Sequence, residues 1–111
     1  MKWLRSLTAG LPGCTEGTSY GTPAFFVNKK MFARIKEDGT TLVIRTEDRE
    51  KWMKKKPAVY FITDHYQNYP EYMLVQLKKV RQKELQDLLV ASWRTRATKA
   101  LIGEYDNRKK K

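Results

Sequence analysis

Cysteine and histidine are almost absent from this chain of 111 residues, which contains only Cys14 and His65. A single thiol cannot close an internal disulfide, and one thiol with one imidazole cannot supply the four ligands of a structural zinc site. No neighbour of Cys14 would activate it as a nucleophile, so we expect a small, half-buried apolar side chain. The sequence therefore excludes two-cysteine redox chemistry within one chain, and we expect neither a metal ion nor a cofactor.

Long hydrophobic runs are also missing. The longest, residues 58–62 and 73–75, are far shorter than the roughly 20 apolar residues that cross a bilayer. Near the N-terminus, Arg5 interrupts the apolar side chains before they resemble a signal peptide. These observations predict a cytoplasmic protein that does not associate with a membrane.

Acidic residues are scarce relative to basic ones: 23 lysines and arginines face 12 aspartates and glutamates, which gives a net charge of +11. Residues 108–111 are all basic, and such charged termini are usually disordered. Without these four cations the chain still carries 19 basic residues and a net charge of +7. A charge of this size predicts attraction to a polyanion, and we expect salt-sensitive, non-specific binding to DNA.

The hydrophobic pattern predicts one domain, residues 1–104, followed by a basic tail, residues 105–111. Trp3, Leu4 and Leu7 share one helical face, and the glycines and proline that follow end this first helix. The pattern then becomes that of strands, over residues 24–27, 31–36 and 41–46. Between the last two, Asp38-Gly39 favours a tight hairpin.

A second helix is expected between Thr46, which can cap its start, and Pro57, which stops it. Two more strands follow, over residues 59–63 and 72–78, and then a long helix over residues 82–98 with apolar side chains at helical spacing. The predicted element order is α-β-β-β-α-β-β-α. This order indicates an α+β fold, a two-layer α/β sandwich in which helices cover one face of an antiparallel five-stranded sheet.

Several short motifs occur in order along the chain: Leu11-Pro12-Gly13, the segment 16–25, Met31-Phe32-Ala33-Arg34, Asp38-Gly39, and the segment 62–70 that begins Ile62-Thr63-Asp64-His65-Tyr66. Over residues 4–93 the chain resembles the MmcQ/YjbR-like proteins. The resemblance implies a small α+β fold related in shape to frataxin-like and secretion-chaperone-like domains, and DNA binding through a double-wing arrangement. The chain departs from the family pattern in its shorter first helix and in residues 81–85, where relatives often have Asp-Pro-Glu-Glu-Leu.

Strand alternation places Phe32, Arg34 and Lys36 together on the sheet face that the helices leave open, with Gln76 and Lys78 beside them. Cations on such a face can contact phosphates, although an ordinary solvated face has the same composition. Because no helix-turn-helix, zinc-finger or RNP motif is present, we expect little base specificity. The cations that we expect to contact DNA are Lys29, Lys30, Arg34, Lys36, Lys78, Lys79, Arg94 and Arg96.

Tyrosines gather in two loop-like segments, residues 16–25 and 62–70, and the second segment also holds the histidine. This concentration suggests an alternative to DNA binding. In the alternative, a groove captures a small ligand or a protein partner. The residues that would line this groove are Tyr20, His65, Tyr66 and Tyr69.

Catalysis is a weaker hypothesis. His65 lies between Asp64 and Tyr66, and an acidic neighbour can in principle orient an imidazole for proton transfer. Adjacent residues on an extended chain point apart, however, and only Ser19 and Cys14 remain as plausible nucleophiles. We therefore expect a binding protein that is not an enzyme, and a monomer rather than an oligomer.

Overall fold

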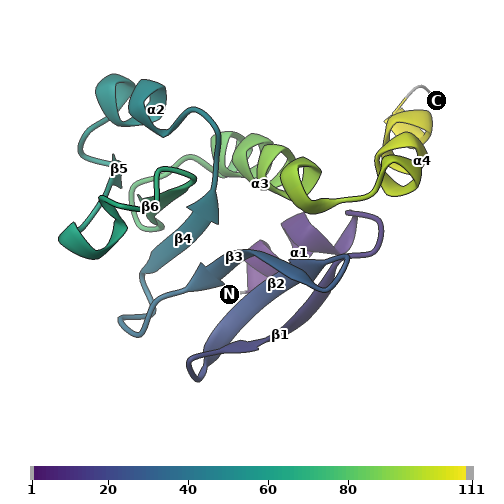
Figure 1. Cartoon of the computed structure of the whole chain (residues 1–111), viewed down its shortest axis with the longest axis horizontal. Helices are drawn as coiled ribbons and strands as arrows, with labels where there is room; N and C mark the ends of the chain where they lie inside the picture. Colours follow the sequence, from purple (N-terminus) through teal and green to yellow (C-terminus); the bar gives the residue numbers. More distant parts are fainter. Residues whose placement is uncertain (1, 110–111) are drawn as a thin grey trace.

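The structure, a computed structural model that describes residues 2–109, has an α+β fold in which helices pack against one antiparallel sheet (Figure 1). Within these residues, no helix combines the length and the hydrophobicity that crossing a bilayer requires. The elements, in chain order, are α1 (Lys2–Ala9), β1 (Thr15–Ser19), β2 (Thr22–Val27), β3 (Lys30–Ile35), β4 (Thr41–Arg45), α2 (Arg49–Lys55), β5 (Tyr60–Phe61), the 3-10 helix η1 (Asp64–Tyr66), β6 (Tyr72–Gln76), α3 (Gln82–Arg96) and α4 (Lys99–Lys109).

The sheet has six strands in the spatial order β1-β2-β3-β4-β6-β5. The prediction of five strands was wrong because residues 15–19 were expected to form a loop. They are polar and include Gly17, so they lack the apolar alternation of a half-buried strand. They nevertheless pair with β2 along their whole length, across a tight turn at Tyr20-Gly21. The pairing with β2 therefore creates this edge strand, and the strand's own pattern does not reveal it.

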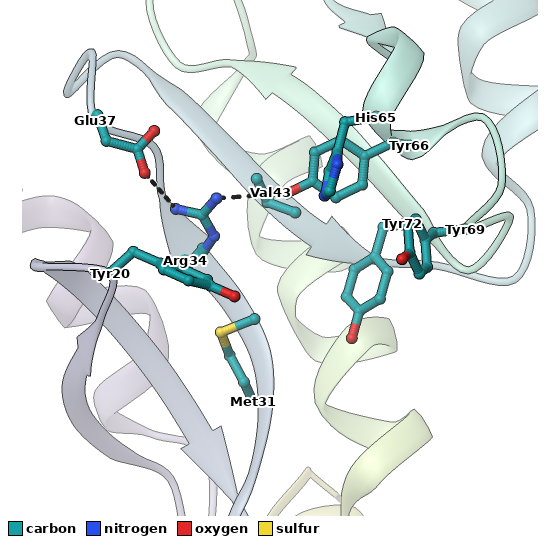
Figure 2. Close-up of a pocket in the computed structure, with 9 residues that line it drawn as sticks. All are labelled: Tyr20, Met31, Arg34, Glu37, Val43, His65, Tyr66, Tyr69 and Tyr72. Atoms are coloured by element: carbon teal, nitrogen blue, oxygen red, sulfur yellow. Dashed lines mark hydrogen bonds and ion pairs between the residues drawn. The ribbon is translucent and has the colours of Figure 1, made fainter.

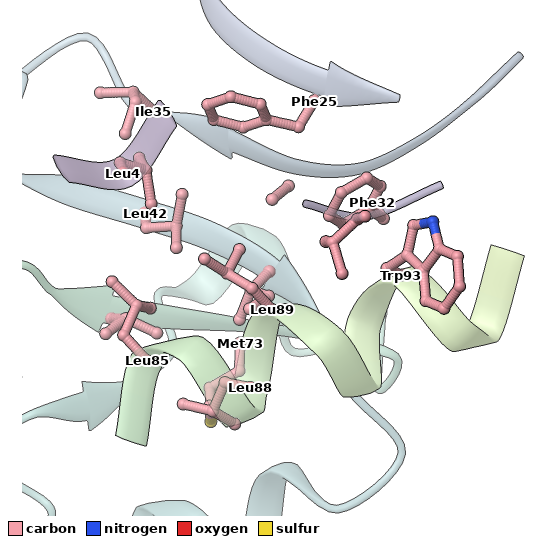
Figure 3. Packing of buried hydrophobic residues seen from close by; sticks show 14 of the residues in the cluster. Leu4, Phe25, Phe32, Ile35, Leu42, Met73, Leu85, Leu88, Leu89 and Trp93 are labelled. Atoms are coloured by element: carbon pink, nitrogen blue, oxygen red, sulfur yellow. The ribbon is translucent and has the colours of Figure 1, made fainter. Parts of the chain in front are cut away.

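Helices α1 and α3 cover one face of the sheet and enclose the main hydrophobic core (Figure 1 and Figure 3). The apolar side chains of α3 are buried at the predicted helical spacing. Each large apolar side chain that is buried in this way contributes roughly 1.5–3 kcal/mol to stability. The core includes Leu4, Phe25, Phe32, Ile35, Leu42, Met73, Leu85, Leu88, Leu89 and Trp93.

A β-bulge in β3 reverses the expected orientation of Phe32. The pairing register of β2 with β3 shifts after Phe25, so β3 carries one extra residue there. That residue is Phe32, which is buried in the core, whereas Met31 and Arg34 lie on the other face. The carbonyl of Phe32 accepts a hydrogen bond from the Ser92 hydroxyl of α3 at 2.8 Å. The prediction that Phe32 shares an open face with Arg34 was wrong because a bulge interrupts strict alternation.

The first two helices lie where the sequence predicted them. Leu4 of α1 is buried in the core and Leu7 packs against it, while the side chain of Trp3 lies outside the described residues. The second helix begins at Arg49, later than the predicted start at Thr46. The hydroxyl of Thr46 accepts a hydrogen bond from the backbone just before this helix, at 3.2 Å.

The C-terminal part of the chain forms more structure than a basic tail. Residues 105–109, which we expected in the tail, belong to α4. The ring of Tyr105 packs against Trp93 of α3 with 5.4 Å between ring centroids, and Asp106 accepts a hydrogen bond from Arg94 at 2.5 Å. These contacts join α4 to α3. Lys110 and Lys111 lie outside the described residues.

Candidate functional site

A groove of about 520 Å³ lies on the sheet face opposite α1 and α3 (Figure 2). Strands β3, β4 and β6 form its floor, the β1–β2 turn lies on one side, and η1 with the loop after it lies on the other. The four residues that the sequence suggested for a groove all lie in it, although they come from two distant segments. The lining residues are Tyr20, Met31, Arg34, Glu37, Val43, His65, Tyr66, Tyr69 and Tyr72.

Tyr20 occupies a position that the backbone does not favour. It lies in the tight β1–β2 turn with a φ of 53°, and Gly21 follows it with a φ of 77°. Such turns prefer glycine, asparagine or aspartate, and a left-handed conformation costs an ordinary residue roughly 1–2 kcal/mol. The side chain is 83% exposed, and its ring lies 5.2 Å from the Arg34 guanidinium. Local strain with an exposed aromatic ring is typical of a binding site.

Arg34 is 8% exposed and lies at the centre of the groove floor. Its guanidinium donates to the Glu37 carboxylate at 3.2 Å, and to the Tyr66 hydroxyl and the Ile35 carbonyl at 3.5 Å each. These are long hydrogen bonds, so the charge of Arg34 is only loosely compensated. Burial alone would lower the pKa of Arg34, but the hydrogen bonds to Tyr66 and Glu37 raise it.

Glu37 is a weak partner for that arginine. Its side chain is 62% exposed, and the pair lies at i,i+3 beside solvent, where ion pairs contribute little. A hydrogen bond from its own backbone amide, together with the Arg34 guanidinium, holds the pKa of Glu37 below its usual range. Glu37 is therefore ionised at neutral pH, and an anionic ligand can replace it at Arg34.

Arg49, the first residue of α2, holds the loop that forms the far side of the groove. Its Nη1 donates to the backbone carbonyls of Tyr66, Tyr69 and Tyr72, at 2.8, 2.9 and 3.1 Å. Its Nη2 donates to the carbonyl of Gln67 at 3.4 Å. Sequence analysis missed Arg49, because its partners lie 17 to 23 residues away and are backbone groups, which carry no side-chain signal.

The rings of this loop form one aromatic cluster. The His65 ring lies edge-to-face against Tyr66 at 4.8 Å between centroids, and at 5.5 Å from Tyr69. Tyr66 is buried beneath them, 6.3 Å from the Tyr72 ring. Tyr69 is 46% exposed. The loop thus presents a cluster of edge-to-face and tilted rings to the groove, with Tyr66 buried beneath the others.

The residues considered for catalysis are not brought together. Within residues 2–109, His65 makes no hydrogen bond to Asp64, Ser19 or Cys14. Cys14 packs against the main core on the opposite face of the sheet, and burial followed by the nearby charge of Glu16 raises the pKa of its thiol to about 11. The thiol therefore stays protonated and unreactive at neutral pH. In the described part of the chain, no cluster of three histidine, cysteine or carboxylate side chains is suited to a metal ion.

The lysines expected to contact DNA form two groups at opposite ends of β3. Lys29 and Lys30 are exposed at the β2–β3 turn, where Lys29 has a φ of 62°. Lys36, Lys78 and Lys79 lie beyond the other end of the strands. Backbone hydrogen bonds connect the segments that carry this second group. The Lys36 amide donates to the Thr41 carbonyl at 2.8 Å, and the Leu77 amide donates to the Thr40 carbonyl at 3.0 Å.

The three arginines expected to contact DNA have other surroundings. Arg34 lies in the groove rather than on an open basic face. Arg94 pairs with Asp106 at 2.5 Å, and its guanidinium lies 5.5 Å from the Tyr105 ring. Arg96 is half-buried at the end of α3. The eight predicted cations therefore do not form a single face.

Comparisons with known proteins place the fold among uncharacterized relatives. A crystal structure of the Deinococcus radiodurans protein DR2400, with a DUF419 domain, is similar over 93% of this chain and 85% of that one, with a TM-score of 0.71 and 25% identity. The uncharacterized proteins Rv2570 of Mycobacterium tuberculosis and Mb2600 of Mycobacterium bovis are 28% identical over 72 residues, which is 65% of this chain.

The chain spans about half the length of these curated mycobacterial relatives, since the match covers 49% of each. The family model YjbR matches residues 9–95, which include every strand of the sheet, η1 and nearly all of α3. Both sides of the groove and its floor lie within the matched residues. The chain belongs to the YjbR family.

Proposed function

We propose that this protein binds DNA without sequence specificity, through contacts between lysines and the phosphate backbone, and performs no chemical step. The observation that supports the proposal is a set of lysines that take part in no ion pair within residues 2–109, in a chain with a net charge of +11. Lys36 lies near the carboxylates of Glu37 and Asp38, whose pKa values its charge helps to lower, whereas lysines without acidic neighbours are free to replace the counterions of a polyanion. The lysines that support the proposal are Lys29, Lys30, Lys36, Lys78 and Lys79.

The placement of the two lysine groups suits contacts with the phosphate backbone of DNA. The six residues of β3 separate them by roughly 17–20 Å, since a strand rises about 3.3 Å per residue. This separation exceeds the roughly 12 Å width of the major groove, so the groups can reach phosphates on both of its edges. Such contacts fix the position of a protein on DNA without reading the bases.

A titration of duplex DNA at two salt concentrations tests this proposal. Five phosphate contacts predict that the affinity falls about 500-fold between roughly 50 and 200 mM salt. The double variant Lys29→Gln, Lys30→Gln should weaken binding and reduce the salt slope by about two. The matched control Lys51→Gln, Lys54→Gln removes the same charge from the exposed side of α2 and should leave the slope unchanged. Fluorescence anisotropy measures the affinity and its dependence on salt. An absence of binding at low salt, or an affinity independent of salt, refutes the proposal.

The groove supports a second candidate function, the capture of a small ligand or a protein partner. Its volume of about 520 Å³ lies within the range of small-molecule sites, and polar groups converge on an apolar lining. The double variant His65→Ala, Tyr66→Phe should abolish capture and leave binding of duplex DNA intact, because the lysines are untouched. A thermal-shift screen of small anionic and aromatic compounds measures capture. Compounds that stabilise wild type and variant equally would exclude this role.

A further inference from the structure

The groove has two aromatic sides with a cation between them. Figure 2 shows Tyr20 on one side of the Arg34 guanidinium, and His65 with Tyr69 on the other. Tyr20 and Tyr69 are the large hydrophobic side chains that the described residues leave most exposed. Ring faces that are exposed beside a cation are what proteins use to bind unpaired bases, since every base has a stacking face and is joined to a phosphate.

Arg34 has hydrogen-bonding capacity that the fold does not use. A guanidinium carries five N–H donors, and those of Arg34 reach their partners only at 3.2–3.5 Å. Its one acidic partner, Glu37, is exposed and loosely bound. A phosphate in this place would accept two parallel hydrogen bonds from the guanidinium, which is the geometry that arginine favours.

The strands beneath the groove argue against a peptide that joins the sheet as a further strand. β3 and β4 lie between two long strands, and β6 lies between β4 and the two-residue strand β5, which pairs with Leu74 and Val75. Peptides that add to a sheet need a free edge, and the groove floor has none. The groups that the groove offers a ligand are therefore mainly side chains, among which rings and the guanidinium of Arg34 predominate. The net charge of +11 also favours a polyanion.

The floor beside Arg34 is apolar. Met31 and Val43 lie beside Arg34, and neither can form a specific hydrogen bond with a base. An apolar surface suits the methyl group of thymine, which uracil lacks. This feature favours DNA over RNA as the source of the base.

We propose that the groove binds an unpaired thymine of single-stranded DNA, stacked against Tyr20 or Tyr69, with the adjoining phosphate on Arg34. The inference rests on the proposed DNA binding and adds a preference within it. In a duplex both faces of a base are already stacked, so a duplex can bind the lysines and not the groove. The protein therefore prefers single strands over duplexes of equal length.

Three labelled oligonucleotides of about ten nucleotides test this inference by fluorescence anisotropy: oligothymidylate, an abasic strand with the same number of phosphates, and a duplex. Wild-type protein should bind oligothymidylate at least about tenfold more tightly than the abasic strand. The double variant Tyr20→Ala, Tyr69→Ala should lower this affinity to the abasic level. Both side chains are exposed, so the variant should fold, which circular dichroism checks. Glu37→Gln, which frees Arg34, should tighten binding of oligothymidylate.

Matched controls distinguish the proposed base site in the groove from the proposed binding of the DNA backbone by lysines. Lys29→Gln, Lys30→Gln should weaken binding of all three oligonucleotides by similar factors. Equal affinity for oligothymidylate and the abasic strand overturns the base site and leaves backbone binding standing. No binding of any oligonucleotide overturns the proposed function itself. A base preference that persists in the tyrosine variant overturns the groove as its location, and tighter binding of an oligouridylate RNA overturns the assignment to DNA.

Discussion

Replacing Trp93 with alanine should lower the free energy of unfolding by about 3–5 kcal/mol. The indole is 0% exposed and packs between the core of the sheet and α4, where its ring meets Tyr105. Its Nε1 donates to the carbonyl of Pro12 at 3.0 Å, so truncation also leaves that buried carbonyl without its partner. Small domains are stable by only 5–15 kcal/mol, so the loss is a large share of the total. Urea unfolding followed by circular dichroism measures it.

Two controls separate the contributions of Trp93. Trp93→Phe keeps much of the packing and loses the hydrogen bond with part of the ring volume, so it should cost about 1–3 kcal/mol, less than Trp93→Ala. Trp52→Ala removes the same ring from a half-buried place on α2 and should cost clearly less than Trp93→Ala. A loss below about 1 kcal/mol for Trp93→Ala would contradict the packing described here.

Most of the sheet and the long helix could be predicted from the sequence because their apolar side chains follow strict periods. Met73 and Val75 do face the main core while Tyr72 and Leu74 face the other way, as alternation requires. β1 could not be predicted in this way. An edge strand buries little, so its identity rests on pairing with β2 and not on its own composition.

The groove was predictable only in part. Tyrosines at Tyr20, Tyr66 and Tyr69 mark its sides in the sequence, and the structure brings them together. Arg34 was expected among other cations on the open sheet face, because nothing in the sequence shows that Tyr20 and Tyr66, from distant segments, contact it there. The inserted residue moves Phe32 into the core and brings Met31 to the groove, while Arg34 keeps the face that alternation predicts.

The structure also shows that the groove depends on an element outside it. Arg49 belongs to α2, which does not line the groove, and yet it holds three carbonyls of the tyrosine loop at once. All three bonds come from Nη1, and Nη2 adds the carbonyl of Gln67 at 3.4 Å, whereas a lysine side chain is one bond shorter and carries no second nitrogen. The position of Tyr69, and with it one aromatic side of the groove, therefore depends on the identity of residue 49.

Arg49→Lys should loosen the loop without changing the net charge of the protein. Because the lysine ammonium ends one bond short of the position of Nη1, the weakened contacts should cost about 2 kcal/mol of local stability, which corresponds to roughly 30-fold faster amide exchange in residues 66–72. The amides of Tyr66, Tyr69 and Tyr72, which are hydrogen-bonded within the loop, report this by NMR hydrogen exchange. Amides of α3 should keep their wild-type rates.

Because its charge is conserved, the same variant separates groove geometry from electrostatics. Binding of duplex DNA should match that of wild type, since the proposed lysine contacts are intact, whereas the preference for oligothymidylate should fall with the displaced tyrosines. Lys51→Arg, an exposed and charge-conserving change in the same helix, controls for effects on α2 itself and should alter neither measurement. Loop amides that exchange at wild-type rates in Arg49→Lys would show that the three carbonyl contacts do not hold the loop, and that the aromatic side of the groove is fixed by ring packing alone.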